Sequence, residues 1–147
     1  MTASGSQRLA ARAAVALALA TVMCLARAAQ PCESADLGCS IFNGQHTIPA
    51  HLRDENDRPL PGTTTRCINC HTRTDSAGTF APPLTPGYLF AATSRRGGPS
   101  SSYDPATFCR ALKDGIDPAE IVLRKAMPRY QISDAECAAL WRFVTHP

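Results

Sequence analysis

The segment Cys67-Ile68-Asn69-Cys70-His71 constrains this chain of 147 residues more than any other part of it. On a helical turn, positions i, i+3 and i+4 share one face. Two thiols on that face can form thioether bonds to the two vinyl groups of one porphyrin, while the imidazole reaches the iron. This spacing is typical of c-type haem attachment. The sequence therefore predicts one haem c per chain, covalently bound through Cys67 and Cys70, with His71 as an iron ligand.

Three other interpretations of this segment compete with haem attachment. A thioredoxin-like pair would need a preceding strand within a parallel sheet, and no such pattern is visible. A zinc site would need two further ligands at finger-like spacing, which the sequence does not supply. A plain disulfide would leave His71 without a role. Haem attachment accounts for all three side chains.

The N-terminal residues 1–28 have the features of an export signal. Arg8 and Arg12 give a basic start, residues 13–26 are apolar, and Ala26-Arg27-Ala28 resembles a small-x-small cleavage site. The apolar stretch is shorter than the ~20 residues of a membrane span, so we expect cleavage rather than a retained anchor. The expected product is one periplasmic domain, residues 29–147, without a stable membrane span.

The other two expectations for this region concern lipidation and charge. Cys24 could accept a lipid, but the bulky Met23 before it fits a lipobox poorly. The whole chain has 15 basic and 12 acidic residues, and three of the arginines lie in the expected signal. The mature protein would thus have a net charge near zero, and a nucleic-acid-binding function loses its main support.

Four cysteines remain after the signal and the haem segment are set aside: Cys32, Cys39, Cys109 and Cys137. An even number in an exported protein suggests two disulfides, with three possible connectivities. We favour Cys32–Cys39, which a short loop closes, and Cys109–Cys137, whose residues lie on apolar faces of predicted helices. Within one helix the first pair would be about 10 Å apart, so Cys32 must precede the helix. Free buried thiols are the alternative.

Three helices are predicted from caps and apolar periodicity. The last follows Ser133, which forms a capping box with Glu136 and precedes an apolar stripe. Another begins at Asp104 and stops at Gly115, and a short one covers about 35–43. A further turn is expected at Asp117-Pro118. No strand is predicted, because alternating β-branched runs are absent.

Several of these positions together resemble the monohaem class I c-type cytochromes. Gly38 and Phe42 are similar to the first helix of that family, whose small residue lets the last helix, here with Leu140-Trp141, cross closely. Pro82-Pro83-Leu84 resembles the family's proline-leucine segment, where a carbonyl accepts the imidazole Nδ1–H. Met127-Pro128 is similar to the distal-ligand loop. The resemblance extends from about Cys32 to Val144.

The resemblance implies an all-α, cytochrome c-like fold of about three to four helices with long loops around one covalent haem. Met127 would be the second iron ligand opposite His71 and is the sole methionine outside the expected signal. Pro83 would lie beside the bound imidazole. From the usual roles of their side chains, Tyr130 and Arg129 either cover or hydrogen-bond a haem propionate or are plain loop residues that do neither. The histidines could give bis-histidine ligation instead: His46, His51 and His146.

The implied function is one-electron transfer by a soluble carrier that is not an enzyme and that exchanges electrons with redox partner proteins. The alternatives are a haem c subunit of a periplasmic dehydrogenase or oxidase complex, and a haem enzyme or gas-binding protein with a displaceable methionine. Residues 45–66 depart from the family pattern as an insertion, which we expect to be a solvated loop. We expect the same of the Arg95-Arg96 pair.

Overall fold

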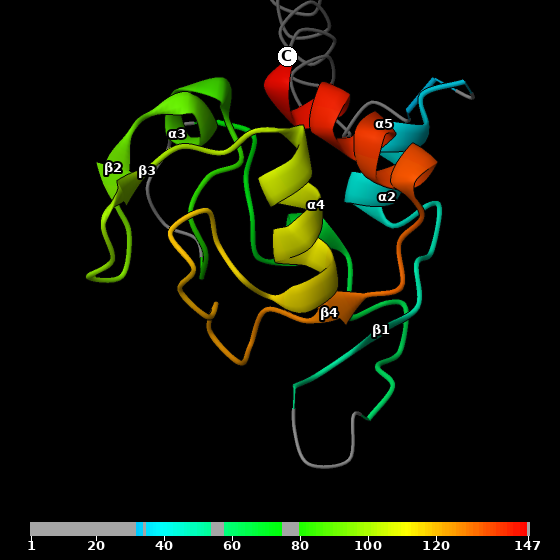
Figure 1. The fold of residues 1–147 in the computed structure, drawn as a ribbon. Coiled ribbons are helices and arrows are strands. Elements are labelled where there is room, and N and C mark those ends of the chain that lie inside the picture. The colour runs from blue at the N-terminus through cyan, green and yellow to red at the C-terminus, as the bar shows by residue number, and fades with distance from the viewer. Residues whose placement is uncertain (1–31, 34, 54–57, 75–79, 147) are drawn as a thin grey trace, which may run out of the picture. The chain divides into compact units, whose positions relative to one another are not determined.

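In the computed structural model, the described residues are 32–33, 35–53, 58–74 and 80–146, and they form four α-helices, one 3-10 turn and two antiparallel sheets (Figure 1). The predicted signal peptide lies outside these residues. The helices are α2 (Leu37–Asn43), α3 (Pro86–Phe90), α4 (Pro105–Asp114) and α5 (Asp134–Thr145), and the 3-10 turn η1 is Cys67–Asn69. Strand β1 (Ala50–His51) pairs with β4 (Arg129–Tyr130), and β2 (Thr93–Ser94) pairs with β3 (Ser100–Ser101).

The prediction of an all-α, cytochrome c-like fold is wrong, because the described residues form a mixed arrangement of helices and small sheets. Each strand has two residues. A strand this short cannot display the alternation by which strands are recognised in a sequence. The 45–66 insertion is also more than a solvated loop, since it supplies β1 and the buried side chain of Ile48.

The three predicted helices are confirmed, and their caps explain their ends. In α4 the Asp104 carboxylate accepts from the Thr107 amide, and Gly115 ends the helix with φ of 69°. In α5 the Ser133–Glu136 capping box is complete. The turn expected at Asp117-Pro118 is confirmed: the Glu120 amide donates to the Asp117 carbonyl at 3.1 Å, and the Asp117 carboxylate accepts from the amides of Ala119 and Ile121.

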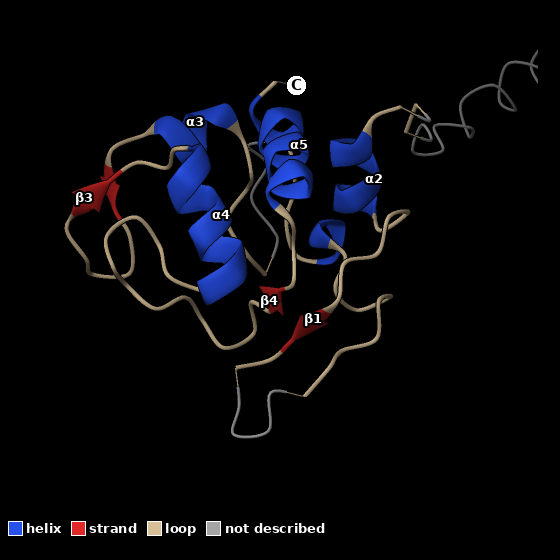
Figure 2. Ribbon diagram, turned by 45° about the vertical axis from the view of Figure 1, so that its right-hand side comes forward, coloured by secondary structure: helices blue, strands red, loops and turns tan. Residues whose placement is uncertain are grey.

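Helix α5 is the centre of the fold and contacts both α2 and α4 (Figure 2). Gly38 of α2 lies so close to α5 that a Cβ there would be 2.6 Å from the Phe143 Cβ. On the other side, the Trp141 ring is 5.2 Å from the Phe108 ring of α4, measured between centroids. The close crossing of α2 and α5 is the one that the resemblance implied.

Both expected disulfides are present. Cys32–Cys39 joins the segment before α2 to the helix, with Cα atoms 5.6 Å apart, and Cys32 does precede the helix. Cys109–Cys137 joins α4 to α5, with Cα atoms 5.8 Å apart. The first disulfide therefore links α2 to the segment before it, and the second links α4 to α5.

Arg95 is buried rather than solvated, contrary to expectation. Its guanidinium donates hydrogen bonds to the carbonyls of Tyr88 (2.7 Å) and Ala91 (2.9 Å) and to that of Ser101. It also lies over the Tyr88 ring, 4.9 Å from the centroid. Arg95 thus holds α3 and the β2–β3 hairpin together.

No helix among the described residues is long and apolar enough to cross a membrane.

Candidate functional site

The Cys67–His71 segment is one 3-10 turn followed by two residues outside it. The amides of Cys70 and His71 both donate to the Cys67 carbonyl, at 3.1 and 2.8 Å. The backbone of Cys70 is no longer helical, with φ of −123° and ψ of −30°. As a result the two thiols, both free, have different surroundings: the Cys67 side chain is buried and Cys70 is exposed.

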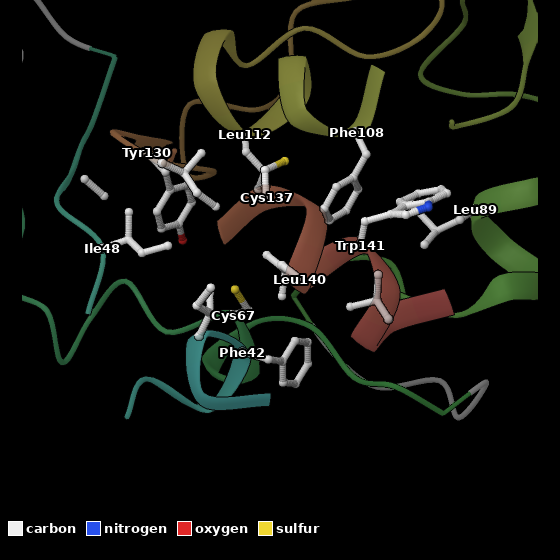
Figure 3. Packing of buried hydrophobic residues seen from close by; sticks show 14 residues of the cluster. Phe42, Ile48, Cys67, Leu89, Phe108, Leu112, Tyr130, Cys137, Leu140 and Trp141 are labelled. Atoms are coloured by element: carbon white, nitrogen blue, oxygen red, sulfur yellow. The ribbon is translucent and has the colours of Figure 1, made fainter. Parts of the chain in front are cut away.

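Cys67 belongs to the hydrophobic core (Figure 3). It lines a small cavity together with Tyr130, Ile132 and Leu140. The Tyr130 hydroxyl donates a hydrogen bond of 2.8 Å to the Thr65 carbonyl, which fixes the ring in place. Burial raises the pKa of the Cys67 thiol to about 11. The Cys67 thiol is therefore protonated and covered.

His71 is oriented by one hydrogen bond. Its Nδ1 is 2.8 Å from the Pro82 carbonyl oxygen. Because a carbonyl only accepts, Nδ1 carries the proton and Nε2 holds the lone pair. That Nε2 is buried and has no hydrogen-bond partner in the described part of the chain. Burial lowers the pKa of His71, which favours the neutral imidazole. The accepting carbonyl belongs to Pro82, the residue before Pro83, which was predicted to lie beside the imidazole.

The remaining predicted site residues lie in the loop before α5 and in β4. Met127 is half-buried against the core, and its amide donates to the Arg124 carbonyl at 2.9 Å. Tyr130 lines the cavity beside Cys67, and its hydroxyl donates a hydrogen bond to the Thr65 carbonyl. Arg129 pairs with His51 across β4 and β1. Of these residues, the structure brings Tyr130 together with Cys67.

The histidines offered for bis-histidine ligation have other contacts. The His46 Nε2 is 2.7 Å from the Glu136 carboxylate. The His146 Nδ1 is 3.0 Å from the Thr145 hydroxyl at the end of α5. His51 lies in β1. The structure therefore distributes the three histidines over separate elements.

The prediction of one haem c, covalently bound through Cys67 and Cys70, is contradicted. The described residues contain no group of three or more His, Cys, Asp or Glu side chains that could hold a metal ion. The prediction assumed both thiols on one face of an α-helical turn, whereas Cys67 is in the core and Cys70 at the surface. The cavity beside Cys67 has a volume of about 10 Å³, room for a single water.

The predicted carbonyl of the Pro82-Pro83-Leu84 segment is confirmed as that of Pro82, whereas sequence reasoning missed the carbonyl of Thr65 that accepts from Tyr130. The Thr65 carbonyl has no sequence signal, because every residue carries a carbonyl.

What the site can do follows from its own residues. An exposed thiol can bond to an electrophile, a buried one can do so after local opening, and the Nε2 lone pair of His71 can accept a bond from a bound group. No family model, curated protein or solved structure matches this chain.

Proposed function

We propose that this protein is an exported one-electron carrier whose candidate redox site is the Cys67–His71 segment. The observation that carries the proposal is the combination of two free thiols three residues apart with an imidazole Nε2 that is buried and unpartnered in the described structure. The described residues keep these two thiols free while four other cysteines are paired.

The unpartnered imidazole nitrogen favours a bound group. A buried polar atom without a hydrogen bond costs about 1–3 kcal/mol. A group that bonds to Nε2 of His71 would remove this cost, and the Nδ1 contact with Pro82 already holds the ring in one tautomer. The resemblance of the segment to class I c-type cytochromes supports electron transfer as the use of that group.

Thiol–disulfide exchange is less well supported as the function. Attack requires a thiolate, and exchange proteins lower the pKa of the attacking cysteine. Here burial raises the pKa of Cys67 to about 11. A buried thiol that stays protonated is poorly suited to repeated exchange.

The periplasm and two redox partner proteins complete the proposal. Two disulfides in a small domain agree with an oxidising compartment. The protein would accept one electron from a donor protein and pass it to an acceptor protein, without transforming a substrate of its own.

Voltammetry of the protein purified from a periplasm tests this function. We expect a reversible one-electron wave. The wave should disappear in the Cys67→Ala/Cys70→Ala double variant and persist in the matched Cys32→Ala/Cys39→Ala variant. The absence of a wave from the unsubstituted protein would overturn the proposal.

A further inference from the structure

The two disulfides of this protein have different surroundings. Cys109–Cys137 joins α4 to α5, where Cys137 is fully buried and Cys109 packs against the core. Cys32 and Cys39 are both half-buried, and Glu33, beside Cys32, is exposed. A reagent from solvent can therefore reach the Cys32–Cys39 bond in the folded protein, whereas Cys109–Cys137 becomes accessible through local opening of the α4–α5 contact.

The side-chain amide of Asn43 is in direct contact with the accessible disulfide. Its Nδ2 donates to the Sγ of Cys32 at 3.3 Å and to the Sγ of Cys39 at 3.4 Å. The same nitrogen donates to the Cys39 carbonyl at 3.0 Å, which holds Asn43 beside that residue. Asn43 and Cys39 belong to α2, whereas Cys32 lies in the segment before the helix. When the S–S bond breaks, the Cys32 sulfur can move away, but the Cys39 sulfur stays next to the amide.

We propose that Cys32–Cys39 is a thiol–disulfide exchange site, in which a dithiol attacks the Cys32 sulfur and Cys39 is the leaving group. A hydrogen bond to a thiolate favours the charged form. A thiol that is more stable as a thiolate leaves faster in exchange. Asn43 supplies this hydrogen bond to Cys39 alone once the two sulfurs have separated. The site is separate from the Cys67–His71 segment and does not depend on the proposed electron-carrier function.

The exchange transfers two electrons from the dithiol to the protein. One thiolate of the dithiol bonds to the Cys32 sulfur as the S–S bond breaks, and the electron pair of that bond leaves with the Cys39 sulfur, which takes a proton from solvent. The second thiol of the dithiol loses its proton and attacks its own sulfur in the mixed disulfide, so that Cys32 leaves as a thiolate and is protonated. The protein disulfide is thus reduced to two thiols, and the dithiol is oxidised to a disulfide.

Dithiothreitol tests this exchange on the full-length protein. It is a neutral dithiol, so the exposed carboxylates of Glu33 and Asp36 do not repel it. Free thiols are first alkylated with iodoacetamide, and the reduction of each disulfide is then followed in time by peptide mass spectrometry. We expect Cys32–Cys39 to be reduced about 100-fold faster than Cys109–Cys137, which serves as the internal control. Equal rates for the two disulfides in the folded protein would overturn the proposal.

A monothiol identifies the sulfur that is attacked. Excess 2-mercaptoethanol forms a mixed disulfide with one cysteine, and a second treatment with iodoacetamide marks the thiol that left. We expect the mercaptoethanol adduct on Cys32 and the new alkyl group on Cys39. The reverse distribution would overturn the assignment of Cys39 as the leaving group.

Asn43→Ala tests the role of the amide. We expect reduction of Cys32–Cys39 to slow about threefold or more, because the leaving thiolate has lost its hydrogen bond. The mercaptoethanol adduct should then divide between Cys32 and Cys39. Gln131→Ala, which removes an exposed amide next to β4, is the matched control and should change neither result. An Asn43→Ala protein with the original rate and the original adduct position would contradict the role of Asn43.

Discussion

Gly38 shows how a single residue sets the distance between two helices. A Cβ at this position would be 2.6 Å from the Phe143 Cβ and closer still to the Ala139 carbonyl of α5. We expect Gly38→Ala to lower the free energy of unfolding by about 1–3 kcal/mol, since α2 and α5 must move apart. Urea unfolding measures this loss.

The matched control is Gly87→Ala, also on a helix. There the nearest atom to a new Cβ would be the Thr85 hydroxyl, 3.9 Å away. We expect a change of less than about 1 kcal/mol, in the stabilising direction that helix propensity gives. If both variants had the same stability as the unsubstituted protein, the tight crossing would be disproved.

For individual residues, the sequence predicted which residue types form the candidate site better than it predicted their environments. The Cys67-x-x-Cys70-His71 spacing predicted a candidate site, but it carried no sign that one thiol would be buried and the other exposed. That difference arises because Cys70 leaves helical geometry, which depends on the chain packed around η1. Arg95 is a similar case, since its burial depends on carbonyls that no motif reveals.

Among the elements, those that could be predicted have local signals. Helices α4 and α5 carry capping residues and apolar stripes over 10 and 12 residues. The strands have two residues each, and β1 pairs with β4, which lies far from it in the sequence, with Ala50 opposite Tyr130. Pairing of this kind is decided by tertiary packing rather than by local pattern. Helix α3 was missed although Thr85 and Pro86 offered a cap, because five residues show no periodicity.

The N-terminus of α5 should make stability depend on pH. Hydrogen bonds from the Ser133 side chain and amide, followed by the His46 contact, lower the pKa of Glu136 from 4.5 to about 2. A lowered pKa in the folded state stabilises the protein above the unfolded value, and this contribution is lost as the pH falls from about 4.5 to about 2. The capping box is therefore weakened in acid.

Glu136→Gln tests this contribution. We expect it to cost about 1 kcal/mol at pH 7, the usual worth of a cap, and to cost less at pH 2, where about half of the Glu136 carboxylates are protonated. Unfolding free energies across this pH range measure the difference. Glu120→Gln, in an exposed pair with Arg110, is the control and should be nearly neutral. A loss for Glu136→Gln that is independent of pH would contradict the assignment.

For the molecule as a whole, cohesion depends on cross-links as well as on the core. The described helices are short, and long irregular segments connect them. A small domain of this kind gains much of its stability from disulfides that restrict the unfolded chain. Cys109–Cys137 has a sequence separation of 28 residues and Cys32–Cys39 one of 7, so the two bonds should contribute differently to the free energy of unfolding.

Removing each disulfide separately measures that difference. The loop-entropy relation gives a loss of about 3–4 kcal/mol for Cys109→Ala/Cys137→Ala and about 2–3 kcal/mol for Cys32→Ala/Cys39→Ala. Burial acts in the same direction, because Cys137 is fully buried at the α4–α5 contact and its truncation leaves a cavity. Urea unfolding of both double variants at one pH gives the two losses. A larger loss for the shorter loop would mean that native packing around α2, and not restriction of the unfolded chain, governs the stability of this domain.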